Sequence, residues 1–366
     1  MFICTINIAQ IDKHSVFIIN NNNNNKQRKN MNNLKKIGLT ALAASLVSTS
    51  VFAGEVSVSG GAAINFENYS MDTSAGAKAA GTKAFSMGNQ LTFTGSGELD
   101  NGMNVAISFV LDQGDDATAA AGPFDSHSVT ISSDAMGTLK FHGEGGDSAQ
   151  NAVGDTAAGN IWDNFDTRNG ADSKLKESNA TNNMMHYTLP SMVDGLTVAA
   201  SYVPGSGLDE SDTAYSMSYT GVEGLTVSYG MGSANGQAAD TEDGTVIKSN
   251  ADASTIKLAY VYGSVTLAYS DHEYDSALAD GTEDQDATSW KVSYTVSDAI
   301  SITYAEEEID SGTAADQDAK YSKLTGAYTS GGMTVSANMQ EMENGDHSTA
   351  ASADAEYVGL SVSFAF

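Results

Sequence analysis

The sequence predicts an all-β fold, a 16-stranded antiparallel transmembrane β-barrel with a long third loop. Three observations predict this fold. Large apolar residues recur at every second position in sixteen short segments, which is the period of a strand with one apolar face. Short turns alternate with long connections along the chain, and an export leader precedes the first segment.

The leader is predicted at residues 31–53. A short basic stretch starts at Met31, an apolar run extends from Ile37 to Val51, and small residues precede Gly54. This order is typical of a cleaved secretory signal peptide rather than of a transmembrane helix. We therefore expect the mature protein to be a single barrel domain, residues 54–366.

The segment upstream of the leader, residues 1–30, has no place in a signal peptide. It contains a run of asparagines from Asn20 to Asn25. We expect it to be a non-native upstream extension, with translation starting at Met31.

The mature chain is strongly acidic. The whole sequence holds 17 basic and 46 acidic residues, and the first 53 residues account for six and one of these. The remaining 11 basic and 45 acidic residues give a formal charge of −34, which argues against nucleic acid as a partner. The single cysteine, Cys4, lies in the removed part, so this exported chain must be held together by something other than a disulfide, such as a large closed sheet.

The alternating segments follow one another from the mature N-terminus to the C-terminus. Each places apolar residues on one face and small or polar residues on the other, as in a strand between lipid and water. The predicted strands centre on 56–66, 91–93, 105–111, 129–131, 139–141, 185–189, 196–202, 215–219, 225–231, 256–260, 265–269, 290–296, 300–304, 321–328, 333–339 and 357–366.

The connections support a barrel over the alternatives, a secreted β-sandwich or a repeat adhesin. Seven short turns rich in Gly, Asn and Asp alternate with eight longer connections. An outer-membrane barrel has short turns at one end and long loops at the other, whereas a sandwich does not. The long connections include 67–88, 113–125, 232–252 and 272–286.

The two faces of the strands predict two environments. Inward positions carry Ser, Thr and Asn, which we expect to face an aqueous lumen without needing protein partners. Outward aromatic residues fall near the strand ends, as at two membrane interfaces. At the loop ends these are Tyr202, Tyr215, Tyr229, Trp290 and Tyr321, and at the turn ends Tyr187, Tyr219, Tyr260, Tyr294, Tyr328 and Phe366. The first five strands offer small residues instead of tyrosine, so we expect that side to pack against another copy of the chain.

The leader, the sixteen segments, Gly137-Thr138-Leu139-Lys140-Phe141 before a long third loop, and the final Phe366 together resemble a Gram-negative general diffusion porin of the alphaproteobacterial type. The resemblance covers residues 54–366. It implies a homotrimer in the bacterial outer membrane, with a third loop that folds inward and constricts the pore. It also implies that the barrel assembly machinery of the outer membrane reads Phe366 as an assembly signal.

The third loop, residues 144–180, is the longest connection, and a loop of this length is usually functional. By the resemblance, its acidic residues form one side of the pore constriction. They are Asp147, Asp155, Asp163, Asp166, Asp172 and Glu177. Trp162 and Phe165 could anchor the loop to the wall. The alternative is that these carboxylates are simply solvated.

Basic side chains fall on the inward parity of the strands. We interpret them as pore-lining groups that face the acidic loop and create a transverse field, although the cost of placing a charge in lipid also explains their position. The candidates are Lys140, His142, Arg168, His186, Lys257, Lys291 and Lys323, of which Arg168 is the one arginine of the mature chain.

No enzyme signature is present. The histidines show no HExxH spacing, and there is no GxSxG nucleophile elbow. We expect no cofactor and no catalytic or metal site, although the acidic run from Asp280 to Asp286 could hold calcium through carboxylate oxygens.

These observations predict a water-filled channel for passive diffusion of small hydrophilic solutes and ions, with a preference for cations because acidic loops concentrate them. Two alternatives stay open. One is a substrate-selective channel with saturable conductance, and the other is a structural or adhesive surface barrel without transport.

Overall fold

The computed structural model describes residues 54–71, 82–112, 124–165, 175–179, 181–205, 211–242, 245–276, 284–313 and 317–366. The predicted extension and signal peptide, residues 1–53, lie outside the described residues, and the start of the mature chain stays a prediction. Residues 54–365 form one compact unit. No helix in the described part of the chain is both long enough and apolar enough to span a membrane.

Sixteen strands make up this unit. Their bounds are β1 Glu55–Met71, β2 Thr82–Glu98, β3 Asn104–Asp112, β4 Ser126–Ser133, β5 Gly137–Glu144, β6 Met184–Thr188, β7 Leu196–Val203, β8 Asp212–Val222, β9 Leu225–Glu242, β10 Thr245–Tyr262, β11 Val265–Asp275, β12 Gln285–Ser297, β13 Ile300–Ile309, β14 Ala319–Ser330, β15 Met333–Glu343 and β16 Ala355–Ala365. A short helix, α2 (Asn151–Gly154), lies between β5 and β6, and two 3-10 turns, Gly345–His347 and Ala351–Ala353, precede β16.

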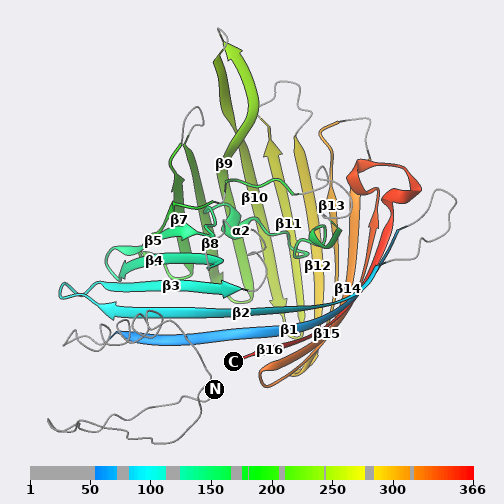
Figure 1. The fold of residues 1–366 in the computed structure, drawn as a ribbon, viewed down its shortest axis with the longest axis horizontal. Coiled ribbons are helices and arrows are strands. Elements are labelled where there is room, and N and C mark those ends of the chain that lie inside the picture. Colours follow the sequence, from blue (N-terminus) through cyan, green and yellow to red (C-terminus); the bar gives the residue numbers. More distant parts are fainter. Residues whose placement is uncertain are drawn as a thin grey trace, which may run out of the picture. The chain divides into compact units, whose positions relative to one another are not determined.

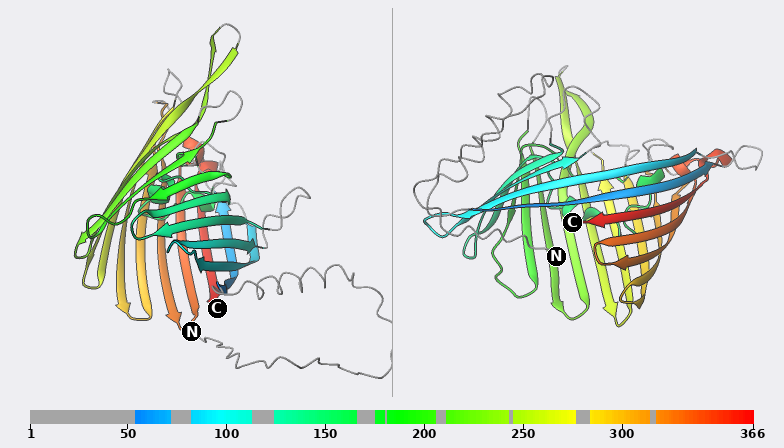
Figure 2. Two further views of the ribbon diagram at one scale, coloured as in Figure 1. Left: turned by 90° about the vertical axis from the view of Figure 1, so that its left-hand side faces the viewer. Right: turned by 60° about the horizontal axis from the view of Figure 1, so that its bottom comes forward.

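The strands close into an antiparallel barrel (Figure 1). Each pairs with its neighbours in sequence, and β1 pairs with β16 from Gly61 opposite Ala365 to Met71 opposite Ala355. In Figure 2 the colours run around the wall until red β16 meets blue β1. The predicted fold class and strand number are therefore confirmed.

Strand pairing sorts the residues into the two predicted faces. Residues directly opposite each other in a ladder share a face, so Val58 with Phe93 and Val335 with Val362 point outward. Ser57 with Thr94 and Ser293 with Thr303 point inward. The outward apolar side chains are exposed on the surface of the barrel, which is the side that meets lipid in a membrane.

The seven short turns occur where the sequence predicts them, and glycine makes several of them possible. Gly224 has a φ of +75°, a region that other residues enter at a cost. A Cβ on Gly224 would also lie 2.5 Å from the carbonyl oxygen of Val261. These turns gather at one end of the barrel, and the long connections gather at the other.

Several predicted loops are partly strand. The prediction of a loop at 232–252 is wrong, because β9 and β10 stay paired from Leu225 opposite Tyr260 to Glu242 opposite Thr245. This hairpin rises above its neighbours in Figure 1. Strands β1, β2, β11 and β12 likewise extend into the predicted loops 67–88 and 272–286. Backbone hydrogen bonds need no apolar alternation, so pairing continues past the point where the lipid-facing pattern stops.

Candidate functional site

The third loop, residues 145–183, enters the barrel between β5 and β6. Its described parts are 145–165, 175–179 and 181–183. Helix α2 lies inside the wall beside β9 and β10 (Figure 1). The loop is therefore not structureless, and it occupies part of the lumen, as the sequence predicts.

The outgoing half of the loop, described at residues 145–165, is held to the inner wall by side chains from successive strands. The donors are backbone or amide N–H groups of the loop, and the acceptors are hydroxyl groups of the wall. The pairs are Ala149 N to Ser201 Oγ at 2.8 Å, Gln150 Nε2 to Thr255 Oγ1 at 2.8 Å, Ala157 N to Ser270 Oγ at 2.8 Å and Ala158 N to Ser289 Oγ at 3.2 Å. The expectation that inward hydroxyls need no protein partner is therefore wrong for the wall under the loop.

Glu307 on β13 is the most heavily bonded anchor of the loop. Its carboxylate accepts hydrogen bonds from Thr156 Oγ1 at 2.5 Å, Trp162 N at 3.1 Å and Ile161 N at 3.3 Å. The side chain is 2% exposed. A hydrogen bond within a folded protein is worth about 0.5–1.5 kcal/mol, and the three together fix the loop against β13.

Beyond Glu307 the loop ends its outgoing path in an apolar cluster. Phe165 is 1% exposed, and its ring centroid lies 6.1 Å from that of Tyr69 on β1 and 5.9 Å from that of Tyr321 on β14. Trp162 is buried in the same cluster. The sequence prediction that Trp162 and Phe165 anchor the loop is confirmed.

Tyr321 corrects a sequence prediction. We expect it to face lipid, with a slip in the alternation before Leu324. The structure keeps β14 in regular register, so Leu324 and Tyr328 point outward and Tyr321 points inward, 3% exposed. Tyr321 belongs to the seat of the loop rather than to the aromatic belt.

The returning half of the loop, described at residues 175–179 and 181–183, packs against β8 to β12. Lys176 N donates to Gln285 Oε1 at 2.8 Å, and Ser178 N donates to Gln150 Oε1 at 2.9 Å. His272 on β11 is 1% exposed and pairs with the Lys176 carbonyl at 2.5 Å. Gly230 on β9 leaves room for helix α2 of the outgoing half, since a Cβ on it would lie 2.5 Å from Val153 Cγ2.

Three acidic residues of the outgoing half of the loop face the lumen. Asp147, Asp155 and Asp163 are exposed, whereas the wall-facing residues between them are buried. Asp155 Oδ1 accepts a hydrogen bond from Asn160 Nδ2 at 2.9 Å. Asp166, Asp172 and Arg168 lie outside the described residues, so their placement stays a prediction.

Glu177, on the returning half of the loop, is a partly buried carboxylate with a shifted pKa. In its hydrogen-bonding orientation the Asn151 amide donates to Glu177 Oε1 at 2.8 Å and to Oε2 at 2.6 Å. Burial raises the pKa of Glu177 to about 7, the charges of Asp155 and Asp147 add to the rise, and Lys257 opposes it. This group therefore changes charge near neutral pH.

The basic residues form two groups rather than one wall. Lys140 and His186 face each other on β5 and β6, with His142 and Asp147 nearby. His186 Nδ1 lies 3.2 Å from the Asp147 carbonyl oxygen. This group sits at the base of the loop.

The second basic group lies beneath the loop, on the wall that holds it. Thr255, Ser289 and Tyr321 are wall residues that touch the loop. Two residues further along the same strands, toward their turn ends, lie Lys257, Lys291 and Lys323. Lys257 Nζ donates to the Asp155 carbonyl at 2.7 Å, and Lys323 lies near Glu307. These lysines therefore support the loop instead of facing it across the lumen.

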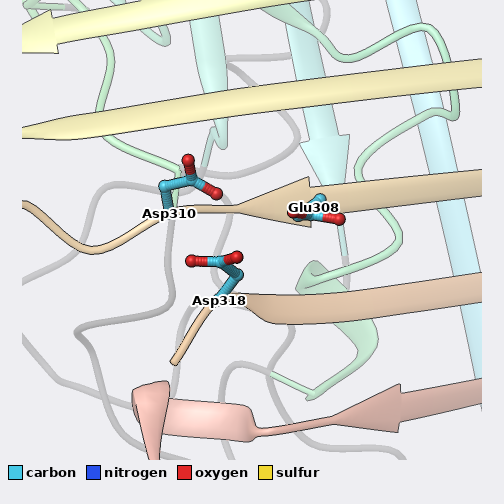
Figure 3. Close-up of side chains that lie close together, drawn as sticks. All are labelled: Glu308, Asp310 and Asp318. Carbon is cyan, nitrogen blue, oxygen red and sulfur yellow. The ribbon is translucent and has the colours of Figure 1, made fainter. Parts of the chain in front are cut away.

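A separate group of three carboxylates lies at the loop ends of β13 and β14. The oxygens of Glu308, Asp310 and Asp318 lie within 4.8 Å of one another (Figure 3). Burial raises the pKa of Asp310, and the charge of Asp318 adds to the rise. The spacing is compatible with a divalent cation. The acidic run predicted to hold calcium, 280–286, lies mostly outside the described residues.

Sequence reasoning missed the anchors Glu307, Gln150 and Tyr69. The parity of β13 would have revealed Glu307, because inward Ser301, Thr303 and Ala305 precede it. The neighbouring acids hide it in the sequence, since three glutamates in a row read as a solvated end of a strand.

Comparisons with known proteins agree with this architecture. Residues 38–347 match the model of a family described as Gram-negative porin. An anion-selective porin from Comamonas acidovorans is 18% identical, with a TM-score of 0.58 over 86% of this chain and 100% of that one. A mutant of the Rh. blastica porin is 17% identical, with a TM-score of 0.59 over 85% and 100%.

A loop deletion mutant of OmpT, an outer membrane protein of Vibrio cholerae, is 16% identical, with a TM-score of 0.60 over 86% and 99%. A search of curated proteins finds no significant match. At these identities the solved structures show a shared fold and nothing finer.

Proposed function

The chain belongs to the Gram-negative porin family, and from this membership we propose that it forms a water-filled channel for passive diffusion of small hydrophilic solutes and ions. The family and the 16-stranded barrel make it an outer-membrane channel rather than an enzyme. The observation that carries the finer proposal is the third loop, which is pinned inside the lumen and exposes carboxylates there.

The exposed carboxylates Asp147, Asp155 and Asp163, with Glu177, form the acidic side of the constriction. His142, His186 and Lys140 at the base of the loop supply the opposite sign, whereas the lysines beneath the loop lie on the same side as its carboxylates. Charges of both signs beside a narrow aqueous passage order solutes by charge and dipole. Asp166, Asp172 and Arg168 are proposed to contribute to the same constriction.

The proposed selectivity is for cations, because the loop carboxylates and the acidic outer loops concentrate them. Reversal potentials in planar bilayers under a KCl gradient test it. The wild-type channel should be cation-selective, and the double variant Asp155→Asn, Asp163→Asn should lose part of that preference. A clear anion preference of the wild type would overturn the proposal.

The proposed partners are outer-membrane lipid, two further copies of the chain and the barrel assembly machinery. Strands β1 and β2 carry an exposed apolar face in which Val56 is 59%, Val58 56% and Phe85 80% exposed. This face has no outward tyrosine among its described residues, which supports the proposal that another copy rather than lipid covers it. Phe366 is proposed as the assembly signal, so its removal should lower the yield of folded barrel in the outer membrane.

Cross-linking tests the trimer. Because the mature chain has no cysteine, Val58→Cys introduces one reporter thiol. We expect cross-linked dimers from intact membranes with Val58→Cys and none with the control Leu267→Cys, on the opposite wall. Equal cross-linking of the two variants would contradict the proposed interface.

A further inference from the structure

A band of acidic side chains, interrupted by Lys320 on β14, lies on the outer, lipid-facing wall at the loop ends of β10 to β16. We call it the outer carboxylate belt. Strand parity and pairing place all its members outward. They are Asp252, Asp271, Glu273, Asp275, Asp286, Glu306, Glu308, Glu341, Glu343 and Glu356.

Several members of the belt face each other directly across a ladder. The pairs are Asp252 with Asp275, Glu273 with Asp286, and Glu341 with Glu356. Like charges in this arrangement destabilise a sheet. A cationic partner on the outer wall would remove this cost, and Lys320, whose Nζ lies 3.2 Å from Glu308 Oε2, does so locally.

Two grooves on this wall combine the carboxylates with aromatic rings. The first, about 330 Å³, is lined by Trp290 and Tyr304 together with Glu306, Glu308, Glu341 and Glu343, and Lys320 lies at its edge paired with Glu308. The two rings lie 5.6 Å apart at an interplanar angle of 57°. Trp290 Nε1 and Tyr304 OH donate to the Glu306 carboxylate at 3.1 and 2.6 Å, which holds it beside the rings.

The second groove repeats this composition four strands away. It measures about 250 Å³ and is lined by Tyr215 and Tyr229 together with Asp252, Glu273 and Asp275. Aromatic faces beside carboxylates attract organic ammonium groups through cation–π and ionic interactions. A bare divalent cation would be bound by oxygens alone, so the rings distinguish the two kinds of ligand.

The position of the grooves determines what can fill them. On β12 and β13 the residues next toward the turns are Val292 and Ile302, which face the hydrocarbon region of the membrane. The belt therefore lies at the level of the lipid headgroups of the outer leaflet. On β1 and β2 the corresponding outward positions hold Asn68, Ser70, Lys83 and Phe85, so these two strands contribute no carboxylate at this level.

We propose that the outer carboxylate belt binds the ammonium groups of amine-bearing lipid headgroups, with the aromatic grooves at Trp290 and Tyr229 as its binding sites. The headgroup ammonium lies against the rings, and the carboxylates neutralise its charge. The inference rests on the outer-membrane location of the barrel and not on its conductance, so it can fail while the proposed channel function holds.

The test uses the full mature barrel reconstituted in vesicles of digalactosyldiacylglycerol, a neutral host lipid without an ammonium group, that contain a trace of spin-labelled phosphatidylethanolamine or phosphatidylglycerol, with EDTA present. Electron paramagnetic resonance measures the fraction of each lipid immobilised on the protein. We expect phosphatidylethanolamine to be favoured about threefold or more over phosphatidylglycerol, as an exposed cation–π contact with ion pairing allows. High salt should reduce this preference.

The variant Glu306→Gln, Glu341→Gln, Glu343→Gln should abolish most of the preference. The matched control Asp194→Asn, Glu223→Gln, Asp298→Asn removes three exposed carboxylates at the turn end and should retain it. If the triple variant does not fold, as judged by its mobility on an unheated gel, Glu341→Gln alone replaces it. Equal immobilisation of the two lipids by the wild type would overturn the proposal, and so would a preference for phosphatidylglycerol that appears in a second sample in which Mg²⁺ replaces EDTA.

Discussion

Glu307 is a carboxylate on the inner wall of a water-filled barrel, yet water hardly reaches it. It is 2% exposed because the third loop lies over it and donates three hydrogen bonds to it. A carboxylate buried without such donors would be expensive. The loop and Glu307 therefore hold each other in place, and the constriction depends on a residue that does not line it.

Glu307→Gln tests this role. The amide keeps the shape but replaces one acceptor oxygen by an NH₂ group, so the loop loses hydrogen bonds to this side chain and should be held less tightly by about 1–3 kcal/mol. We expect a noisier single-channel current with a larger mean conductance. Glu306→Gln, the same change on the outward face of the same strand, is the control and should leave the current unchanged.

Glu177 makes the constriction sensitive to pH. Its pKa of about 7 lies above the ordinary value of 4.5 because of burial and the neighbouring Asp155 and Asp147. The folded protein therefore holds this proton between about pH 4.5 and 7, where the unfolded chain has lost it. The bound proton therefore stabilises the folded barrel against the unfolded chain. This stabilisation is complete below pH 4.5 and is lost as the pH rises through 7.

In the channel the same titration adds one negative charge to the constriction. Cation selectivity, measured as reversal potential, should increase between pH 6 and 8 with a midpoint near 7. Glu177→Gln should remove this step, whereas Asp163→Asn, which removes an exposed carboxylate elsewhere on the loop, should keep it. A step that survives Glu177→Gln would assign the titration to another group.

At the scale of elements, the sequence predicts the strands well and their ends poorly. Alternation between lipid and water is imposed on every strand inside the membrane, so all sixteen strands can be recognised. The hairpin of β9 and β10 continues through 232–252 without that alternation, and only the structure shows it.

The sequence likewise predicts only part of the candidate site. The position of the third loop and its anchors Trp162 and Phe165 could be predicted, because loop length and composition are local properties. The contacts of Gln150 with Thr255 and of Thr156 with Glu307 join residues 105 and 151 positions apart. No local pattern specifies such pairs. The inward orientation of Tyr321 follows from regular alternation with Leu324 and Tyr328, and the sequence interpretation missed it by assuming a slip in that alternation.

The whole molecule separates its surfaces by chemistry. The lumen holds the pinned loop, with exposed carboxylates above a row of lysines. The outer wall is apolar at β1 and β2 and carries the outer carboxylate belt at β10 to β16. One barrel thus offers an aqueous passage inside, a face for another copy on one side and a face for lipid headgroups on the other.

The most direct test of the central claim is the single-channel conductance of the purified barrel in 1 M KCl, with and without the third loop. Replacing residues 150–177 by a short Gly-Ser linker removes the constriction and leaves the sixteen strands. Stepwise currents that become several times larger in the shortened variant would support a water-filled pore narrowed by this loop. A wild-type barrel that conducts nothing, or a shortened barrel with unchanged conductance, would contradict the account.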